Sequence, residues 1–231
     1  MAPKVSSSQG RHLKGLILLY EDRDVLVVDK PPGLLTVATD RERERTAYHI
    51  LTDFVRKGNP KSRNRIFIVH RLDRETSGVL IFAKSEAAKL RLQGQWDGTE
   101  KQYLAVVHGK LREKSGKIST YLAENRGHTV YSTPDASAGK LSHTAYETLR
   151  EGDAYSLLRV HLLTGRKHQI RVHLADAGHP VVGDQKYGKG DGHKRLALHA
   201  LSISFDHPVT GKRLAFETDV PGDFIRLAGG P

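Results

Sequence analysis

The stretch IFIVHRLDRETSGVLIFA, residues 66–83, places a polar segment between two apolar runs. The runs 66–69 and 79–83 are short and rich in aliphatic and aromatic residues, which is typical of buried strands. Residues 70–78 between them include two arginines, an aspartate, a glutamate and a histidine. We therefore predict a polar loop that core strands hold on both sides, a position where proteins often carry functional groups.

Asp73 is the central acidic residue of this loop. Arg71 and Arg74 both lie within two residues of it. A nearby cation favours the ionised form of a carboxyl group, and an ionised carboxylate serves as a nucleophile, a base or an electrostatic stabiliser. The same residues also suit an ion-paired turn in which Thr76 and Ser77 bond to the backbone. Composition alone leaves both interpretations open.

Outward from this loop, hydrophobic periodicity predicts more strands than helices. Several strands are joined by short turns and should therefore be antiparallel. The expected class is α+β, a large mixed, mainly antiparallel β-sheet with flanking helices and loops. The predicted strands are 16–20, 25–28, 66–69, 79–83, 103–107, 143–149, 155–163, 198–205 and 213–216, and the predicted helices are 46–55, 86–96 after the cap Ser85, 165–177 and 224–227.

Two other segments have little regular pattern. Residues 108–140 are rich in Gly, Ser and Lys and predict loops and weak edge strands. Residues 1–15 are polar and basic and predict a flexible tail. No linker is visible in between, so we expect residues 16–231 to form one domain.

Composition restricts the function before any motif is considered. The 231 residues include 37 Lys and Arg against 26 Asp and Glu, a net charge of +11 that suits a polyanionic partner such as nucleic acid. The chain has no cysteine, which excludes disulfides and thiolate metal sites. No signal peptide and no apolar run of membrane-spanning length is present. We expect a cytoplasmic, monomeric protein.

The loop sequence HRLDRETSGV, residues 70–79, closely resembles the signature of the RluA-type RNA pseudouridine synthases, HRLD-x-x-[TS]-[ST]-G. Further matches follow along the chain: VVDKPPG at 27–33, EKQYLA at 100–105 and TGRKHQIRVH at 164–173, continued by GHP at 178–180 and GD at 183–184. Many members carry an additional N-terminal S4-type RNA-binding domain, and we expect none here because about 15 residues precede the first predicted strand.

The resemblance implies an isomerase that breaks the bond between uracil N1 and ribose C1′ and rejoins the base through C5. It implies that Asp73 is the catalytic residue. Its first step, whether attack on C1′, addition to C6 or removal of the ribose 2′ proton, stays open. The reaction needs no redox cofactor, and we expect neither cofactor nor metal. None of the 13 histidines has the spacing of a helical HExxH zinc site.

The resemblance also implies partners for Asp73. Tyr103 is expected to stack on the flipped uracil or to help move the C5 proton, although an ordinary core tyrosine fits too. Arg171 is expected to pair with Asp73, the alternative being a surface helix residue. We expect RNA contacts from Arg71, Arg74, Arg166, Lys167 and His168. Arg166 and Lys167 fall at the start of the predicted helix 165–177, where cations oppose the helix dipole but suit a phosphate.

The substrate implied is a specific uridine in large-subunit rRNA or tRNA. Two other functions remain possible from the sequence: a catalytically inactive RNA-binding protein on the same scaffold, and a hydrolase that cuts a glycosidic bond. The presence of Asp73, Tyr103 and Arg171 argues against the first, and the HRLD signature argues against the second.

Overall fold

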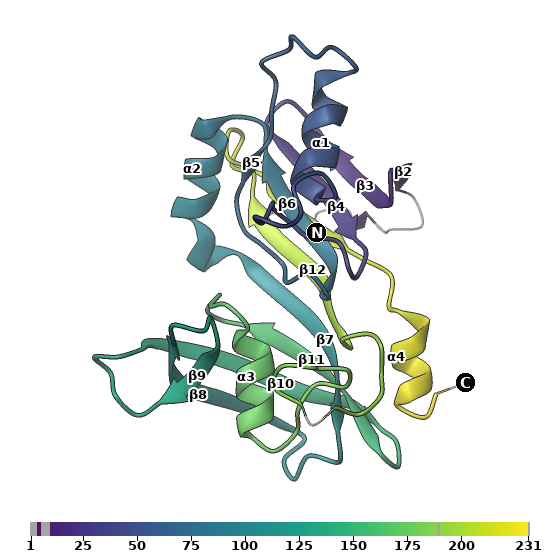
Figure 1. Cartoon of the computed structure of the whole chain (residues 1–231), viewed down its shortest axis with the longest axis vertical. Coiled ribbons are helices and arrows are strands. Elements are labelled where there is room, and N and C mark those ends of the chain that lie inside the picture. The colour runs from purple at the N-terminus through teal and green to yellow at the C-terminus, as the bar shows by residue number, and fades with distance from the viewer. Residues whose placement is uncertain (1–3, 6–9, 189, 231) are drawn as a thin grey trace. The chain divides into compact units, whose positions relative to one another are not determined.

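The computed structural model describes residues 4–5, 10–188 and 190–230 of the chain. These residues form two compact units, one of residues 1–100 with 200–219 and the other of residues 101–199 with 220–231 (Figure 1). The class is the predicted one, α+β with a large, mixed, mainly antiparallel β-sheet and few helices. In the described part of the chain no helix is long and apolar enough to cross a membrane.

The first unit is built on strands in the order β2-β3-β4-β6-β12, with β13 beside β12, β1 parallel to β13 and β5 beside β6. The predicted hairpin is present as β3 and β4. The strands are β1 (Lys4–Val5), β2 (Arg11–Leu13), β3 (Leu16–Glu21), β4 (Val25–Lys30), β5 (Phe67–Ile68), β6 (Ser77–Ala83), β12 (Leu198–Asp206) and β13 (Arg213–Glu217). The helices are α1 (Ala47–Arg56), α2 (Glu86–Gly94) and the 3-10 helix η2 (Trp96–Gly98).

Strand β6 is buried along its whole length, as the apolar run at residues 79–83 predicts for most of it. Its second residue, Gly78, has a φ of 110°, and a Cβ there would lie 2.2 Å from the backbone oxygen of Ala200 in β12. Only glycine allows this approach, so the end of the polar loop is fixed directly against the sheet.

The second unit contains an antiparallel sheet in the order β7-β11-β10-β8-β9. Helix α3 packs on β8, β9 and β10, and α4 contacts β11. The bounds are β7 (Glu100–His108), β8 (Ser115–Glu124), β9 (Val130–Thr133), β10 (Lys140–Glu151), β11 (Tyr155–Leu162), α3 (Gln169–Asp176) and α4 (Gly222–Leu227).

The structure corrects the expectation for residues 108–140. They contain the long strand β8, paired with β10 over residues 115–122, as well as the edge strand β9, rather than only loops and weak edge strands. The apolar alternation of β8 is incomplete, because its inward positions include Gly116 and Thr120 beside the apolar Ile118 and Leu122. The Thr120 hydroxyl is hydrogen-bonded to Ser132 in β9 and to His173 in α3.

The N-terminal tail predicted over residues 1–15 contains two short strands, β1 and β2. The part of this prediction that concerns residues 1–3 and 6–9 lies outside the described residues. The predicted helix at 86–96 ends earlier, at Gly94, and is followed by η2. Its predicted cap is confirmed, since the Ser85 hydroxyl accepts a hydrogen bond from the Ala88 N–H at 3.1 Å.

Candidate active site

The loop that carries Asp73 joins β5 to β6, and hydrogen bonds between Thr36 and the backbone of Leu72 anchor it. The buried hydroxyl of Thr36 donates to the Leu72 carbonyl at 2.8 Å and accepts from the Leu72 N–H at 3.2 Å. The Thr76 N–H closes a turn by donating to the Asp73 carbonyl at 3.2 Å. Hydrogen bonds of Leu72 before Asp73 and of Thr76 after it therefore fix the backbone at this position. The Asp73 side chain itself is half-buried.

Lys30 ties this loop to the DKPPG segment. Its ammonium is completely buried and donates to three backbone carbonyls, those of Pro31, Leu34 and Arg74, at 2.9, 2.8 and 3.0 Å. The Gly33 N–H also donates to the Arg74 carbonyl, and Arg74 Nε donates back to the Gly33 carbonyl. Burial lowers the pKa of Lys30 to about 8, while the negative charges of nearby carboxylates raise it. Lys30 thus stays mainly protonated at pH 7 and adds a fixed cation beneath the Asp73 loop.

The sequence motifs alone predict no role for Lys30. The sequence does contain a hint of its role, because this lysine ends the largely apolar strand β4. Lysine is almost never fully buried unless its ammonium is paired or hydrogen-bonded. What only the structure supplies is the identity of the acceptors, one of which is 44 residues away in the Asp73 loop.

The other expected residues of this loop have different environments. Arg71 is exposed, and Arg74 is largely exposed although its Nε is bound to Gly33. His70 points inward: its Nε2 accepts from the Ile81 N–H at 3.1 Å, and its ring packs on Trp96 with centroids 4.7 Å apart. His70 therefore serves the structure of the loop.

In the second unit, Arg171 on α3 forms a buried two-point ion pair with Asp184. Arg171 Nε lies 2.7 Å from Asp184 Oδ2, and Arg171 Nη2 lies 2.8 Å from Asp184 Oδ1. The side chains are 11% and 0% exposed, which excludes the surface-residue interpretation of Arg171. Burial alone would raise the pKa of Asp184, but the hydrogen bonds and charge of Arg171, with two backbone N–H groups, lower it below its ordinary value.

Asp184 was noted in the sequence only as part of a motif. The structure shows that it orients the guanidinium, because a forked pair fixes the plane as well as the position of an arginine. The Tyr187 ring packs against the same guanidinium, whose carbon lies 5.1 Å from the ring centroid. The expected pairing of Arg171 with Asp73 stays a prediction.

Helix α3 begins at Gln169, not at residue 165, so Arg166 and Lys167 precede the helix. The Gln169 side-chain oxygen accepts from the Thr164 hydroxyl and the Arg166 N–H, and its amide donates to the His143 carbonyl and the Thr144 hydroxyl. This buried amide holds residues 164–168 in a loop that helical periodicity alone could not reveal. The prediction that Arg166 and Lys167 lie in the first turn of a helix is therefore wrong.

The three basic residues of this loop also differ from one another. Arg166 is exposed. Lys167 Nζ lies 2.5 Å from Glu124 Oε1, so it is engaged by a carboxylate. His168 has a left-handed backbone, with a φ of 54°, and its Nδ1 is hydrogen-bonded to the Tyr187 hydroxyl at 2.8 Å. Contact of these three residues with RNA stays a prediction.

Tyr103 lies on β7, opposite Val160 of β11, and is 8% exposed. Burial to this extent fits a core tyrosine as well as a ring beside a bound base. The catalytic assignment of Tyr103 therefore stays a prediction.

His173, at the end of the TGRKHQIRVH segment, is a buried hydrogen-bonding residue rather than a surface one. Its Nε2 and Nδ1 are hydrogen-bonded to the hydroxyls of Thr120 and Thr144 at 3.0 and 2.9 Å. Its side chain has no exposed surface, and this burial lowers the pKa of His173 to about 4. The neutral ring is therefore part of the packing that holds α3 on the sheet.

The His173 environment predicts a loss of stability in acid. A histidine titrates near pH 6.5 in an unfolded chain, so the unfolded state binds the additional proton between pH 6.5 and 4. The free energy of unfolding should fall by about 2 kcal/mol between pH 7.5 and 5 from this residue alone. Urea unfolding of the protein and of His173→Gln at both pH values measures the difference, with exposed His12→Gln as the control. An equal pH dependence in all three proteins would contradict the prediction.

One cluster of potential metal ligands occurs among the described residues, formed by Asp22, Asp24 and His207. Hydrogen bonds within the fold account for it. His207 Nδ1 accepts from the N–H groups of Val209 and Thr210, and Nε2 lies 2.9 Å from Asp22 Oδ2. Both ring nitrogens are thus used in joining two turns, and we assign no metal to the cluster.

Comparison with known proteins agrees with the motifs and the fold. The family model described as RNA pseudouridylate synthase matches residues 24–176. An uncharacterised RNA pseudouridine synthase of Mycoplasma genitalium is 34% identical over 95% of this chain and 71% of its own length. Ribosomal large subunit pseudouridine synthase D of Pseudomonas aeruginosa is 35% identical over 92% of this chain and 70% of its own.

A solved structure gives the same result. Human RNA pseudouridylate synthase domain containing 1 superposes with a TM-score of 0.72 at 30% identity, covering 92% of this chain and 86% of that one. The fold and the HRLD loop define an isomerase that acts on uridines in RNA. The chain belongs to the RNA pseudouridylate synthase family, among proteins of the RluA type.

Proposed function

We propose that this protein converts specific uridines of large-subunit rRNA or tRNA into pseudouridine, with Asp73 as the catalytic residue and Tyr103 and Arg171 serving the same reaction. The observation that carries the proposal is the construction of the Asp73 loop. Lys30, Thr36 and Gly78 hold its backbone rigidly while the carboxylate is left half-buried. A group that must meet a reacting atom at a defined position needs such a support.

The proposed roles follow from the chemistry of each group. All three candidate first steps for Asp73 use the carboxylate form, which a cation stabilises. Arg171 supplies a permanently charged guanidinium, and the pair with Asp184 engages two of the five N–H donors that such a group carries. Tyr103 offers a ring for stacking and a hydroxyl for proton transfer at C5. Arg71, Arg74 and Arg166, all exposed, suit phosphate contacts, while Lys167 and His168 would first have to leave Glu124 and Tyr187.

Large-subunit rRNA is the first substrate to test, because the Pseudomonas aeruginosa relative is named for it. Unmodified transcripts of large-subunit rRNA and of tRNAs would be incubated with the protein, and pseudouridine mapped by carbodiimide modification and primer extension. We expect stops at one or a few uridines and no release of free uracil. Pseudouridine at no position of either RNA class would contradict the proposed function, and free uracil would instead indicate a glycosidic hydrolase.

A further inference from the structure

The most basic continuous segment of the first unit directly follows helix α1. Residues 56–65, here called the basic loop, contain Arg56, Lys57, Lys61, Arg63 and Arg65 and no acidic residue. They supply five positive charges of a chain whose net charge is +11. The loop follows α1 and projects past the end of that helix (Figure 1).

The charges of the basic loop are not neutralised within the fold. In the described part of the chain no ion pair involves any of its five cations. Elsewhere in the same unit basic side chains do meet carboxylates, as Lys84 meets Glu21 and Lys89 meets Glu86. Unpaired cations close together repel one another, which destabilises the free protein. A bound polyanion would relieve this repulsion.

The helix dipole explains only part of this charge. Arg56 ends α1 and Lys57 is its cap, where cations are favoured. Lys61, Arg63 and Arg65 lie beyond the helix and receive no such benefit, because the effect is confined to the last turn. The Arg65 guanidinium packs over the Phe67 ring, with its carbon 4.9 Å from the ring centroid. A second reason is therefore needed for Lys61 and Arg63.

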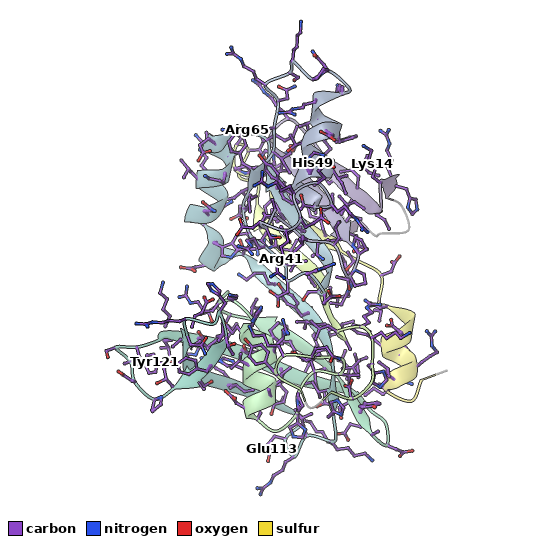
Figure 2. The ribbon with its side chains drawn as sticks, in the orientation of Figure 1. Lys14, Arg41, His49, Arg65, Glu113 and Tyr121 are labelled. Carbon is purple, nitrogen blue, oxygen red and sulfur yellow. The ribbon has the colours of Figure 1, made fainter. Side chains whose placement is uncertain are left out.

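The loop is also ordered by its own hydrogen bonds. The Asn59 N–H donates to the Arg56 carbonyl and the Ser62 N–H to the Asn59 carbonyl, both at 3.0 Å. Asn64 Nδ2 donates to the Val55 carbonyl at 3.5 Å. Lys57, Lys61 and Arg63 are exposed. Figure 2 shows side chains of this loop standing away from the ribbon, with Arg65 at its exit.

We propose that the basic loop binds the phosphodiester backbone of the RNA substrate beside the nucleotide that is isomerised. Arg65 precedes Asp73 by eight residues, so their Cα atoms lie at most about 28 Å apart. Stacked nucleotides advance about 3.4 Å each, so Arg65, at the end of the loop, lies within about eight nucleotides of the target uridine. The inference rests on the proposed function, and it adds a second contact region that governs affinity rather than chemistry.

The test uses two variants with the same change in charge. The loop variant carries Lys57→Gln, Lys61→Gln and Arg63→Gln, side chains that make no hydrogen bond within the described residues. The control carries Lys14→Gln, Arg23→Gln and Lys212→Gln, which are exposed and scattered over the same unit. Kd for a labelled large-subunit rRNA transcript would be measured between 50 and 300 mM KCl, and the isomerisation rate at saturating enzyme would be measured in a single turnover.

We expect the loop variant to raise Kd about 10- to 100-fold at 100 mM salt and to reduce the slope of log Kd against log salt by about 2. The control should stay within about threefold of the unaltered protein. The saturated rate should be unchanged in both. Unchanged RNA affinity in the loop variant, or equal weakening in both variants, would overturn the proposal. If the unaltered protein binds the transcript without isomerising it, the proposed function fails while the comparison of Kd values still decides the role of the loop.

Discussion

Asp73→Asn is expected to abolish pseudouridine formation, with a fall in the single-turnover rate of at least about 10²- to 10⁴-fold. The amide has nearly the same shape but cannot act as a nucleophile or as a base. The backbone of the loop should be unaffected, because its hydrogen bonds to Thr36 and Lys30 involve main-chain atoms of other residues. Carbodiimide mapping or tritium release from labelled uridine would measure the rate, and gel shift would measure RNA affinity.

Glu75 provides a matched control in the same loop. It is a carboxylate two residues away and its side chain is 50% exposed. Glu75→Gln removes an equal charge from the same region and should retain the rate to within about threefold. Retained activity in Asp73→Asn would overturn the catalytic assignment of Asp73, and equal losses in both variants would show that the loop contributes charge rather than a reacting group.

Arg171→Ala is expected to have two effects, a loss of activity and a loss of stability. Removing the guanidinium leaves the fully buried Asp184 carboxylate without its ion-pair partner. Breaking a buried pair from one side typically costs about 3–5 kcal/mol of unfolding free energy. A simple alanine variant would therefore confuse catalysis with folding, and chemical denaturation must accompany every activity measurement.

A double variant separates the two effects. Arg171→Met with Asp184→Asn removes both charges and keeps the Asp184 side-chain oxygen that accepts from the Lys186 and Tyr187 N–H groups. Stability should recover by about 2 kcal/mol or more relative to Arg171→Met alone, because no uncompensated charge is left buried. Activity should stay at the background level. Recovery of activity together with stability would show that Arg171 only maintains the fold.

Much of the architecture could be read from hydrophobic pattern. The hairpin of β3 and β4, the buried strand β6 and the hairpin of β10 and β11 follow from apolar runs separated by turns, since side-chain period reports directly on burial. Pattern failed for β8, where Gly116 and the hydrogen-bonded Thr120 interrupt the apolar inner face, and at the start of α3, where the Gln169 side chain stabilises a loop. In both places polar groups satisfy one another inside the fold, and a hydrophobic scale records them as exposed.

By itself, the sequence determined the family, the α+β class and the choice of Asp73, because those depend on local strings and on the period of apolar residues. Tertiary structure decided what holds each functional group. Lys30 reaches a carbonyl 44 positions away, and Asp184 meets Arg171 across 13 positions. The pairing of a buried charge with its partner depends on where the chain returns in space. No local sequence pattern encodes which distant residue will meet the charge. Once the two residues meet, the high free-energy cost of leaving a buried charge unpaired keeps them together.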